Sequence, residues 1–97
     1  MPKGYWIAQI DVTDPAAYEG YRKLTPDIIA AHGGRFIVRG GAQKAVEGAA
    51  RPRTVVVEFP SYEAARACYV SPGYQAAAAI RQGAAASNFL LVEGWEG

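Results

Sequence analysis

Four short runs of apolar and β-branched residues alternate with segments of helical spacing, and their order limits the possible folds more than any other feature of the chain. The runs are Tyr5–Val12, Arg35–Arg39, Thr54–Phe59 and Asn88–Glu93, and each has the length and composition of a β-strand. Helical segments follow the first and third runs. The order β-α-β-β-α-β predicts a ferredoxin-like α+β domain over residues 1–97, with a four-stranded antiparallel sheet and helices on one face.

The first helical segment has clear start and end signals. Asp14-Pro15 should begin it, because a carboxylate can cap free amides and proline tolerates the first helical position. The helix should run to about His32, and Gly33-Gly34 should end it, because glycine enters the left-handed region at low cost. Pro26 lies inside this segment and lacks an amide donor. It predicts a kink or a short break near residues 24–25.

The second helical segment is predicted to be split in two. Ser61 should cap a helix that runs to about Tyr69. Ser71-Pro72 then repeats the same start signal for a helix over Gly73–Gln82, which Gly83 should end.

A loop is expected between the second and third strands. It spans Ala42–Arg53, and Pro52 marks the return toward the third strand. Gln43–Val46 could extend the strand pair as a ribbon.

Charge and residue counts exclude several classes of protein. The 97 residues carry a formal net charge of +1, so the chain lacks the concentrated basic face that nucleic-acid binding requires. One Cys and one His cannot form a disulfide framework or supply the ligands of a zinc site. No apolar run is long enough for a signal peptide or a membrane span. We expect a cytoplasmic protein, and the prevalence of Ala and Arg over Lys indicates a bacterial source.

The face of the sheet that the helices leave open is expected to be partly apolar. The helix-facing set should be Phe36, Val38, Val55, Val57 and Phe59. The opposite set still contains Ile37 and Val56, and the first and fourth strands are apolar on both faces. Because exposed apolar patches of this kind usually mark an interface, we expect two sheets to pack face to face in a homodimer around a partly apolar cavity.

Arg39 and Glu58 are the charged residues that this arrangement singles out. If the second and third strands pair antiparallel, both side chains point to the face without helices, where a charge is costly unless it is paired or bound by a ligand. Three interpretations remain, namely a structural ion pair, exposed strand ends, or a binding site. In a binding site, Arg39 would receive a small carboxylate or phenolate, and Glu58 would orient or deprotonate it.

His32, Tyr69 and Tyr74 are further candidates for chemistry. His32 is the one imidazole of the chain and a candidate general base, but a protonated ring at a helix C-terminus would also be favoured structurally. Tyr69 and Tyr74 flank the predicted helix break and could donate to an oxyanion. Cys68 should be buried and inert. Helical spacing favours a packing role for the remaining helix tyrosines, Tyr18, Tyr21 and Tyr62.

A set of short motifs is spread over nearly the whole chain. They are Asp14-Pro15 with Tyr18 and Tyr21, Gly33-Gly34-Arg35, Arg39-Gly40-Gly41, Glu47-Gly48, Glu58-Phe59-Pro60, Ser71-Pro72-Gly73-Tyr74, Arg81 and Glu93-Gly94. This set resembles the bacterial family described as domain of unknown function 1330. Two positions depart from the family pattern, since Cys68 replaces a common aromatic residue and Gly73 a common acidic one.

The resemblance implies the fold of a dimeric α/β barrel. That fold group includes cofactor-independent monooxygenases, isomerases of ring lactones, haem enzymes and ligand-binding proteins. The family's own chemistry is unassigned, so the resemblance offers several activities and selects none.

We therefore expect a small homodimeric protein, without a cofactor, that binds a compact anionic or aromatic molecule between sheet and helices, with Arg39 as its anchor. One alternative is a cofactor-independent enzyme of the monooxygenase or isomerase type, in which His32 or Glu58 removes a proton. In that version Arg39 and either Tyr69 or Tyr74 would hold the developing oxyanion. The other alternative is a structural dimer without a site. Haem is not expected, because the one imidazole is predicted at a helix end.

Overall fold

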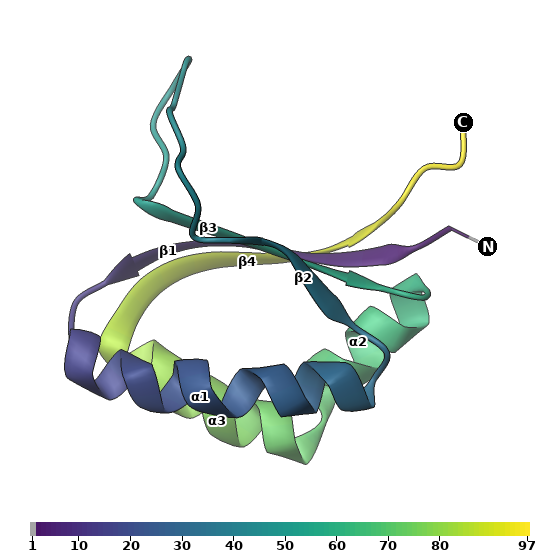
Figure 1. The fold of residues 1–97 in the computed structure, drawn as a ribbon, viewed down its shortest axis with the longest axis horizontal. Helices are drawn as coiled ribbons and strands as arrows, with labels where there is room; N and C mark the ends of the chain where they lie inside the picture. Colours follow the sequence, from purple (N-terminus) through teal and green to yellow (C-terminus); the bar gives the residue numbers. More distant parts are fainter. Residues whose placement is uncertain (1) are drawn as a thin grey trace.

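A four-stranded antiparallel sheet forms one layer of the molecule, and helices cover one of its faces (Figure 1). The computed structural model describes residues 2–97. The strands are β1 (Gly4–Val12), β2 (Arg35–Arg39), β3 (Arg53–Phe59) and β4 (Ala85–Glu93), and they lie in the order β2-β3-β1-β4. The helices are α1 (Pro15–Ala31), α2 (Tyr62–Val70) and α3 (Pro72–Ala84). The predicted ferredoxin-like α+β fold is confirmed. Within residues 2–97, every helix is too short or too polar to cross a membrane.

Side-chain caps begin the helices where the sequence predicted them. Asp14, Ser61 and Ser71 each accept a hydrogen bond from the amide three residues further on, which satisfies a donor that the first helical turn leaves free. Ser71 also ends α2, so the predicted division of the second helical segment is confirmed. α3 then continues through Gly83, and β4 begins at Ala85, earlier than predicted.

The loop between β2 and β3 has no strand over residues 43–46, so the predicted ribbon is wrong. A side chain joins the two limbs of the loop in place of a backbone ladder. The Gln43 amide donates to the carbonyl of Arg51 at 2.8 Å, and its oxygen accepts from the Thr54 hydroxyl at 2.6 Å.

α1 runs through Pro26 without interruption, so of the predicted kink or short break near residues 24–25 the short break is wrong. Proline has no N–H to donate to the carbonyl four residues earlier, which here belongs to Arg22. The Arg39 side chain, at the end of β2, supplies a donor instead, with 3.3 Å between its Nη2 and the Arg22 carbonyl oxygen. Arg39 of the sheet thus donates to the helix carbonyl that Pro26 leaves without a donor.

Trp6 of β1 lies at the centre of the core between the sheet and the helices. Its side chain is 2% exposed, and its indole N–H donates to the carbonyl of Ala65 in α2 at 2.9 Å. Four aromatic rings surround it at centroid distances of 4.6 to 6.1 Å, namely Phe59, Tyr69, Tyr74 and Phe89. Such tilted and edge-on contacts stabilise the core beyond the area that they bury.

An irregularity in β2 changes which side chains face the helices. The register with β3 shifts between Phe36 and Val38, so that Ile37 is an extra residue. Phe36 faces the helices, and after the shift Val38 pairs with Val56 on the open face and is 42% exposed. The predicted place of Val38 in the helix-facing core is therefore wrong. Arg39, the next residue, lies on the helix-facing side.

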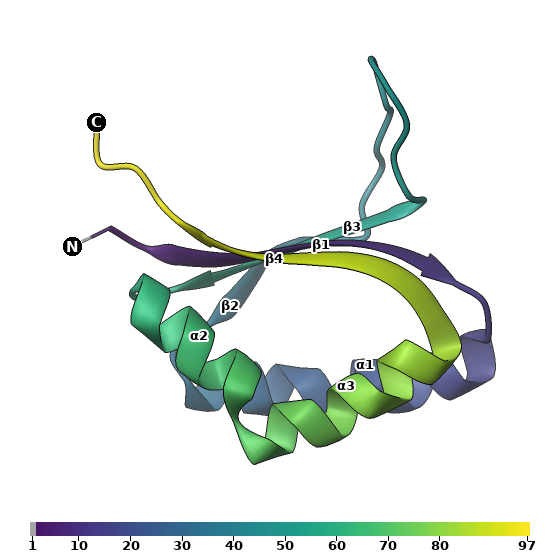
Figure 2. The same cartoon turned by 180° about the vertical axis from the view of Figure 1, so that it is seen from behind.

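The open face of the sheet is flanked by two projecting segments. The loop between β2 and β3 and the carboxyl-terminal tail both extend away from the sheet on the side opposite the helices (Figures 1 and 2). Val46 in the loop is 82% exposed, and Trp95 in the tail is 92% exposed. Between them the sheet presents Leu90, which is 58% exposed, and the half-buried Ile7 and Val56. This is the partly apolar face that the strand pattern predicted.

Gly4→Ala tests how closely β1 passes the start of α2. A Cβ atom at residue 4 would overlap the backbone carbonyl of Ser61, which cannot move without shifting the helix. We expect the melting temperature to fall by about 5–20 °C, because overpacking of this kind costs about 1–3 kcal/mol. Gly41→Ala is the control, since a Cβ there meets nothing within 4 Å. Equal melting temperatures for the two variants would contradict this packing.

Candidate functional site

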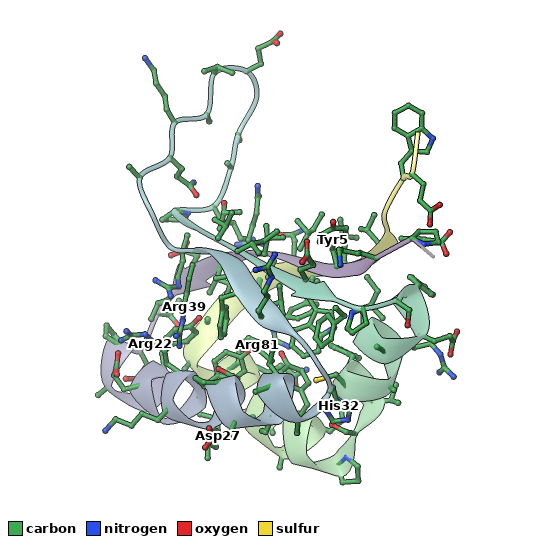
Figure 3. All side chains as sticks on the ribbon, turned by 45° about the vertical axis from the view of Figure 1, so that its right-hand side comes forward. Tyr5, Arg22, Asp27, His32, Arg39 and Arg81 are labelled. Atoms are coloured by element: carbon green, nitrogen blue, oxygen red, sulfur yellow. The ribbon has the colours of Figure 1, made fainter. Side chains whose placement is uncertain are left out.

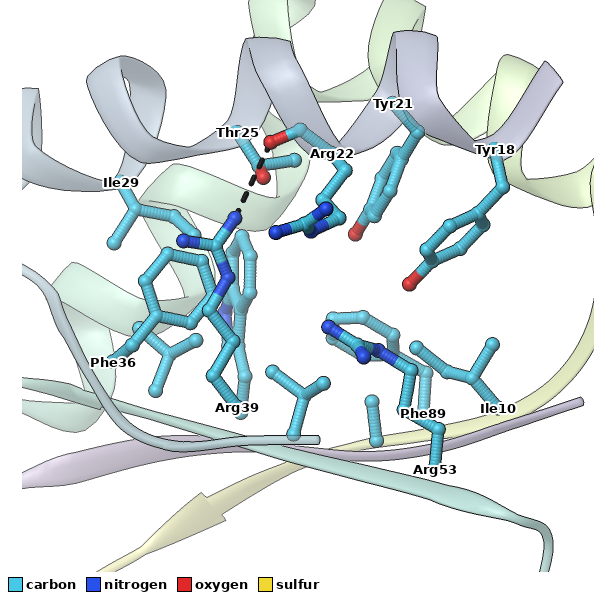
Figure 4. A pocket seen from close by; sticks show the side chains of 14 residues that line it. Ile10, Tyr18, Tyr21, Arg22, Thr25, Ile29, Phe36, Arg39, Arg53 and Phe89 are labelled. Atoms are coloured by element: carbon cyan, nitrogen blue, oxygen red, sulfur yellow. Dashed lines mark hydrogen bonds between the residues drawn. The ribbon is translucent and has the colours of Figure 1, made fainter. Parts of the chain in front are cut away.

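A cavity lies between α1 and the helix-facing side of the sheet (Figure 4). Its walls are mainly apolar and include Trp6, Ile10, Ile29, Val55 and Phe89. Three arginines and two tyrosines add polar groups around this apolar space. The enclosed volume is about 20 Å³, which is room for about one water molecule.

The three arginines come from three different elements and converge on the cavity. Arg22 lies on α1, Arg39 ends β2 and Arg53 begins β3, and their side chains reach the space from the helix and from the sheet (Figure 4). Arg22 forms an ion pair with Glu19 at 3.0 Å. The Arg39 guanidinium lies 4.1 Å above the centroid of the Phe36 ring, a cation–π contact that holds it over the cavity.

Arg53 depends on a glycine for its place. Gly40 has a φ of 69°, a conformation that side chains other than glycine rarely adopt, and a Cβ there would overlap the Arg53 guanidinium. The Nε atom of Arg53 is buried and has no hydrogen-bond partner within residues 2–97. The positive charge of Arg53 therefore lies beside the cavity without a carboxylate to pair with in the described chain.

Two tyrosines of α1 direct their hydroxyl groups into the cavity. Figure 4 shows the hydroxyls of Tyr18 and Tyr21 pointing from the helix toward the sheet. The Tyr21 hydroxyl also lies 2.7 Å from that of Tyr74, a residue of α3 that is 0% exposed. Burial raises the pKa of both Tyr21 and Tyr74 above the usual range for a phenol, so both hydroxyls carry their protons at neutral pH.

Arg81 of α3 is a buried cation behind these tyrosines. It is 4% exposed, and its Nη1 donates to the Ser87 hydroxyl at 2.6 Å. Its guanidinium lies 5.8 Å from the Tyr21 ring centroid and 5.1 Å from that of Phe89. Burial by itself would lower the pKa of Arg81, but electrostatic interaction with Tyr74 and Tyr21 outweighs burial and raises the pKa, so the group stays charged. Within residues 2–97, no carboxylate forms an ion pair with it.

Arg39 and Glu58 do not come together, so their predicted placement on one face is wrong. Glu58 lies on the open face, where it pairs with Arg35 at 3.1 Å and accepts from the Tyr5 hydroxyl at 3.4 Å. Arg39 lies on the helix-facing side, opposite Tyr5 (Figure 3). The cause is the extra residue Ile37, which reverses the alternation of β2 before Arg39. Glu58 therefore cannot orient a ligand that Arg39 holds.

His32 lies away from the cavity. It caps the C-terminus of α1, and its Nδ1 is 3.0 Å from the carbonyl of Ile28 in the same helix. It lies at the C-terminal end of α1, ten residues beyond Arg22, which is in the middle of the helix (Figure 3). This geometry matches the helix-end role that the sequence offered as an alternative. A catalytic role for His32 stays a prediction without support from the cavity.

Tyr69, Tyr74 and Cys68 belong to the core behind the cavity. The Tyr69 ring packs 6.1 Å from Trp6 and 5.4 Å from Tyr74. Tyr74 reaches the cavity only through its hydrogen bond to Tyr21. Cys68 is 0% exposed, as expected, and burial raises the pKa of its thiol to about 11, so it is unsuited to nucleophilic chemistry.

Sequence reasoning missed most of the polar residues of this site. Helical spacing predicts a packing role for Tyr18 and Tyr21, and the sequence predicts no role in a site for Arg22, Arg53 and Arg81. One signal was present, since Tyr21 and Arg22 follow Tyr18 by three and four residues and so share its side of the helix, which has a mixed polar and apolar character. The groups that most often bind metals, His, Cys, Asp and Glu, nowhere gather in threes within residues 2–97.

Comparisons with known proteins identify a family and a fold. The model of the family described as domain of unknown function (DUF1330) matches residues 3–95. No curated protein matches the chain significantly. A protein of unknown function from Rhodopseudomonas palustris has a similar structure, with a TM-score of 0.76 and 18% sequence identity over 99% of this chain and 85% of that one.

Two further solved structures share the fold. A cofactor-independent oxygenase, SnoaB from Streptomyces nogalater, is similar with a TM-score of 0.66 and 16% identity over 100% of this chain and 97% of its own. A dimeric ferredoxin-like protein of unknown function from Thermobifida fusca is similar with a TM-score of 0.64 and 20% identity, over 95% of this chain and 91% of its own. At these identities the likeness establishes the fold alone.

Pro26→Ala tests the link between the helix and the arginine of the cavity. The new amide would donate to the Arg22 carbonyl within α1 and displace the weaker bond from Arg39. We expect stability to rise by about 1–2 kcal/mol, less than the full cost of a proline inside a helix, because proline also restricts the unfolded chain. Thermal unfolding measures this, with Pro15→Ala at the helix start as the control. A lower or unchanged melting temperature for Pro26→Ala would argue against the link.

Proposed function

The chain belongs to the DUF1330 family, a family of unknown function, and from its cavity we propose that the protein binds a compact aromatic or similarly flat organic anion. Arg39 is the anchor of this ligand. Arg22 and Arg53 assist it, and the apolar walls receive the ring.

The observation that carries the proposal is a cluster of cations above an apolar cavity. Arg39 and Arg53 form no ion pair within residues 2–97, although both lie beside the cavity. Exposed arginines on a surface need no such partner, but the Nε of Arg53 is buried and leaves a donor unused. An anionic group on a flat apolar molecule would satisfy these donors and fill the space below them.

The cavity is closed by side chains, and these can move. Its volume of about 20 Å³ is too small for an aromatic ring. Arg22 and Arg39 are exposed, and a single bond of 3.3 Å joins the Arg39 side chain to the Arg22 carbonyl. A ligand carboxylate would replace that carbonyl as the acceptor for Arg39, so the cavity opens by side-chain rotation without a change in the backbone.

The geometry supports binding better than proton abstraction by the expected bases. His32 and Glu58 both lie outside the cavity lining. An enzyme that uses either of them to deprotonate a molecule held by Arg39 would need that group within hydrogen-bond reach of the ligand. The similarity to an oxygenase such as SnoaB concerns the fold, and it gives no base to this site.

We also propose that the protein is a homodimer in which two copies pack through their open sheet faces. Leu90, Ile7 and Val56 form an apolar centre on this face. The loop over Gly40–Pro52 and the tail that carries Trp95 project from the two ends of the open face (Figures 1 and 2). Both segments would contact the partner's sheet. The similar protein from Thermobifida fusca is described as dimeric.

The ligand proposal is tested by thermal unfolding with benzoate, 4-hydroxybenzoate and phenol as probes. A ligand at about 100 times its Kd stabilises by about 2.7 kcal/mol, so we expect one of the carboxylates to raise the melting temperature by about 10–20 °C. Arg39→Ala should lose this shift. Arg66→Ala should keep it, because Arg66 is an exposed arginine of α2 that pairs with Glu63. Equal shifts in the two variants would exclude Arg39 as the anchor.

The dimer proposal is tested by light scattering at micromolar concentration. Leu90→Glu places a charge in the apolar centre of the open face, where burial would leave it unpaired, and should produce a monomer. Val70→Glu is the matched control, because Val70 is 54% exposed on α2 and Leu90 is 58% exposed on β4. A parent protein with the mass of a single chain would refute the dimer.

A further inference from the structure

We infer that the inner end of the cavity is an oxyanion site, in which the Tyr21 hydroxyl, supported by Tyr74 and Arg81, binds a phenolate or enolate oxygen of the ligand. This inference rests on the proposed function, because it concerns the same cavity. It defines the ligand further, as a molecule with a carboxylate at one end and an acidic hydroxyl at the other.

The direction of the hydrogen bond between Tyr21 and Tyr74 follows from burial. Tyr74 is 0% exposed, and within residues 2–97 the Tyr21 oxygen is the one acceptor bonded to its hydroxyl. If Tyr74 did not donate to Tyr21, its proton would be buried without a partner, which costs about 1–3 kcal/mol. Either hydroxyl could donate across this 2.7 Å contact, and the complete burial of Tyr74 favours Tyr74 as the donor. The proton of Tyr21 is then free to point into the cavity, where Figure 4 places its hydroxyl.

Arg81 places a buried positive charge close to the hydrogen-bonded pair of Tyr21 and Tyr74. A guanidinium only donates, so Arg81 can support the Tyr74 oxygen but cannot accept a proton from it. Its charge acts on both Tyr74 and Tyr21, and it lies 5.8 Å from the Tyr21 ring centroid. Arg81 is almost fully buried, and its Nε is unpartnered within residues 2–97. An anionic oxygen at Tyr21 would give this cation the counter-charge that the described chain does not provide.

The two ends of the cavity therefore suit two different oxygens. The exposed guanidinium of Arg39 forms the outer end, where a carboxylate can enter with part of its hydration retained. The inner end offers one neutral hydroxyl backed by a buried cation, which suits a single oxygen on a ring or an enol. Donors already oriented toward a developing negative charge stabilise the ionised form over the neutral one.

Tyr18 provides a matched control within the same cavity. It lies on the same helix, its hydroxyl also points into the space (Figure 4), and its ring centroid is 5.5 Å from that of Tyr21. Tyr21 is the residue that the structure links to Tyr74. Removal of the Tyr18 hydroxyl should therefore leave the preference for an anionic oxygen intact, whereas removal of the Tyr21 hydroxyl should abolish it.

The test uses 4-hydroxy-3-nitrobenzoate, which has a carboxylate for the outer end and a nitrophenol whose ionised form absorbs visible light. Binding is followed separately through the fluorescence of Trp6, which lines the cavity, in a Trp95→Phe background that removes the exposed second tryptophan. We expect the phenol pKa of the bound probe to lie about one unit below that of the free probe, a roughly tenfold preference for the ionised form. The released proton passes to the buffer.

The variants then separate the possible outcomes. Tyr21→Phe should return the phenol pKa of the bound probe to the free value, whereas Tyr18→Phe should keep it lowered. Tyr74→Phe keeps the Tyr21 hydroxyl, so the phenol pKa of the bound probe should rise only part of the way back to the free value. This variant keeps the test valid if Tyr21→Phe does not fold. Binding without a lowered phenol pKa, or equal loss in Tyr18→Phe and Tyr21→Phe, would overturn the oxyanion site alone. If neither Trp6 fluorescence nor melting temperature responds to the probe, the proposed ligand class itself fails.

Discussion

The site depends on a single extra residue in an edge strand. Ile37 shifts the register of β2 against β3, and side chains beyond it therefore face opposite to the direction that a regular strand would give them. Without the shift Arg39 would lie on the open face, the same face as Glu58, and the cavity would lose the cation at its mouth. With it, Glu58 pairs with Arg35 outside, and Arg39 turns toward α1. The bulge therefore separates the charges of two neighbouring strands onto the two faces of the sheet.

A helix defect completes the position of this arginine. Pro26 leaves the Arg22 carbonyl without its usual donor, and that carbonyl is the acceptor which Arg39 finds at 3.3 Å. The strand irregularity and the proline lie in different elements, and together they bring the Arg39 donor to the free Arg22 carbonyl. Because the bond is weak and lies at the exposed mouth, a stronger acceptor can replace it at little cost. The two local irregularities therefore place at the cavity a contact between Arg39 and Arg22 that the proposed ligand carboxylate would displace.

The order of the elements could be predicted from the sequence, because Asp14, Ser61 and Ser71 cap helices by local hydrogen bonds that need no tertiary contact. The site could not be predicted to the same extent. A strict alternation over Arg35–Arg39 fits the sequence as well as a bulged one does, and the choice depends on packing against β3 and α1. The helix break expected at Pro26 failed for the same reason, since the compensating donor lies in another element. The placement of Arg39, and the partners of Tyr21, are properties of the tertiary structure.

The buried positive charge is the feature that packing alone does not explain. Arg81 is 4% exposed, is flanked by aromatic rings and has no carboxylate paired with it in residues 2–97. Withdrawing a charge from water without a partner lowers stability, and an apolar side chain of similar size would fill the same space at lower cost. The rings and the Ser87 hydroxyl offset part of this cost, and none of them neutralises the charge. A cost retained beside a cavity supports the proposed anionic ligand, because a bound negative charge would offset that cost.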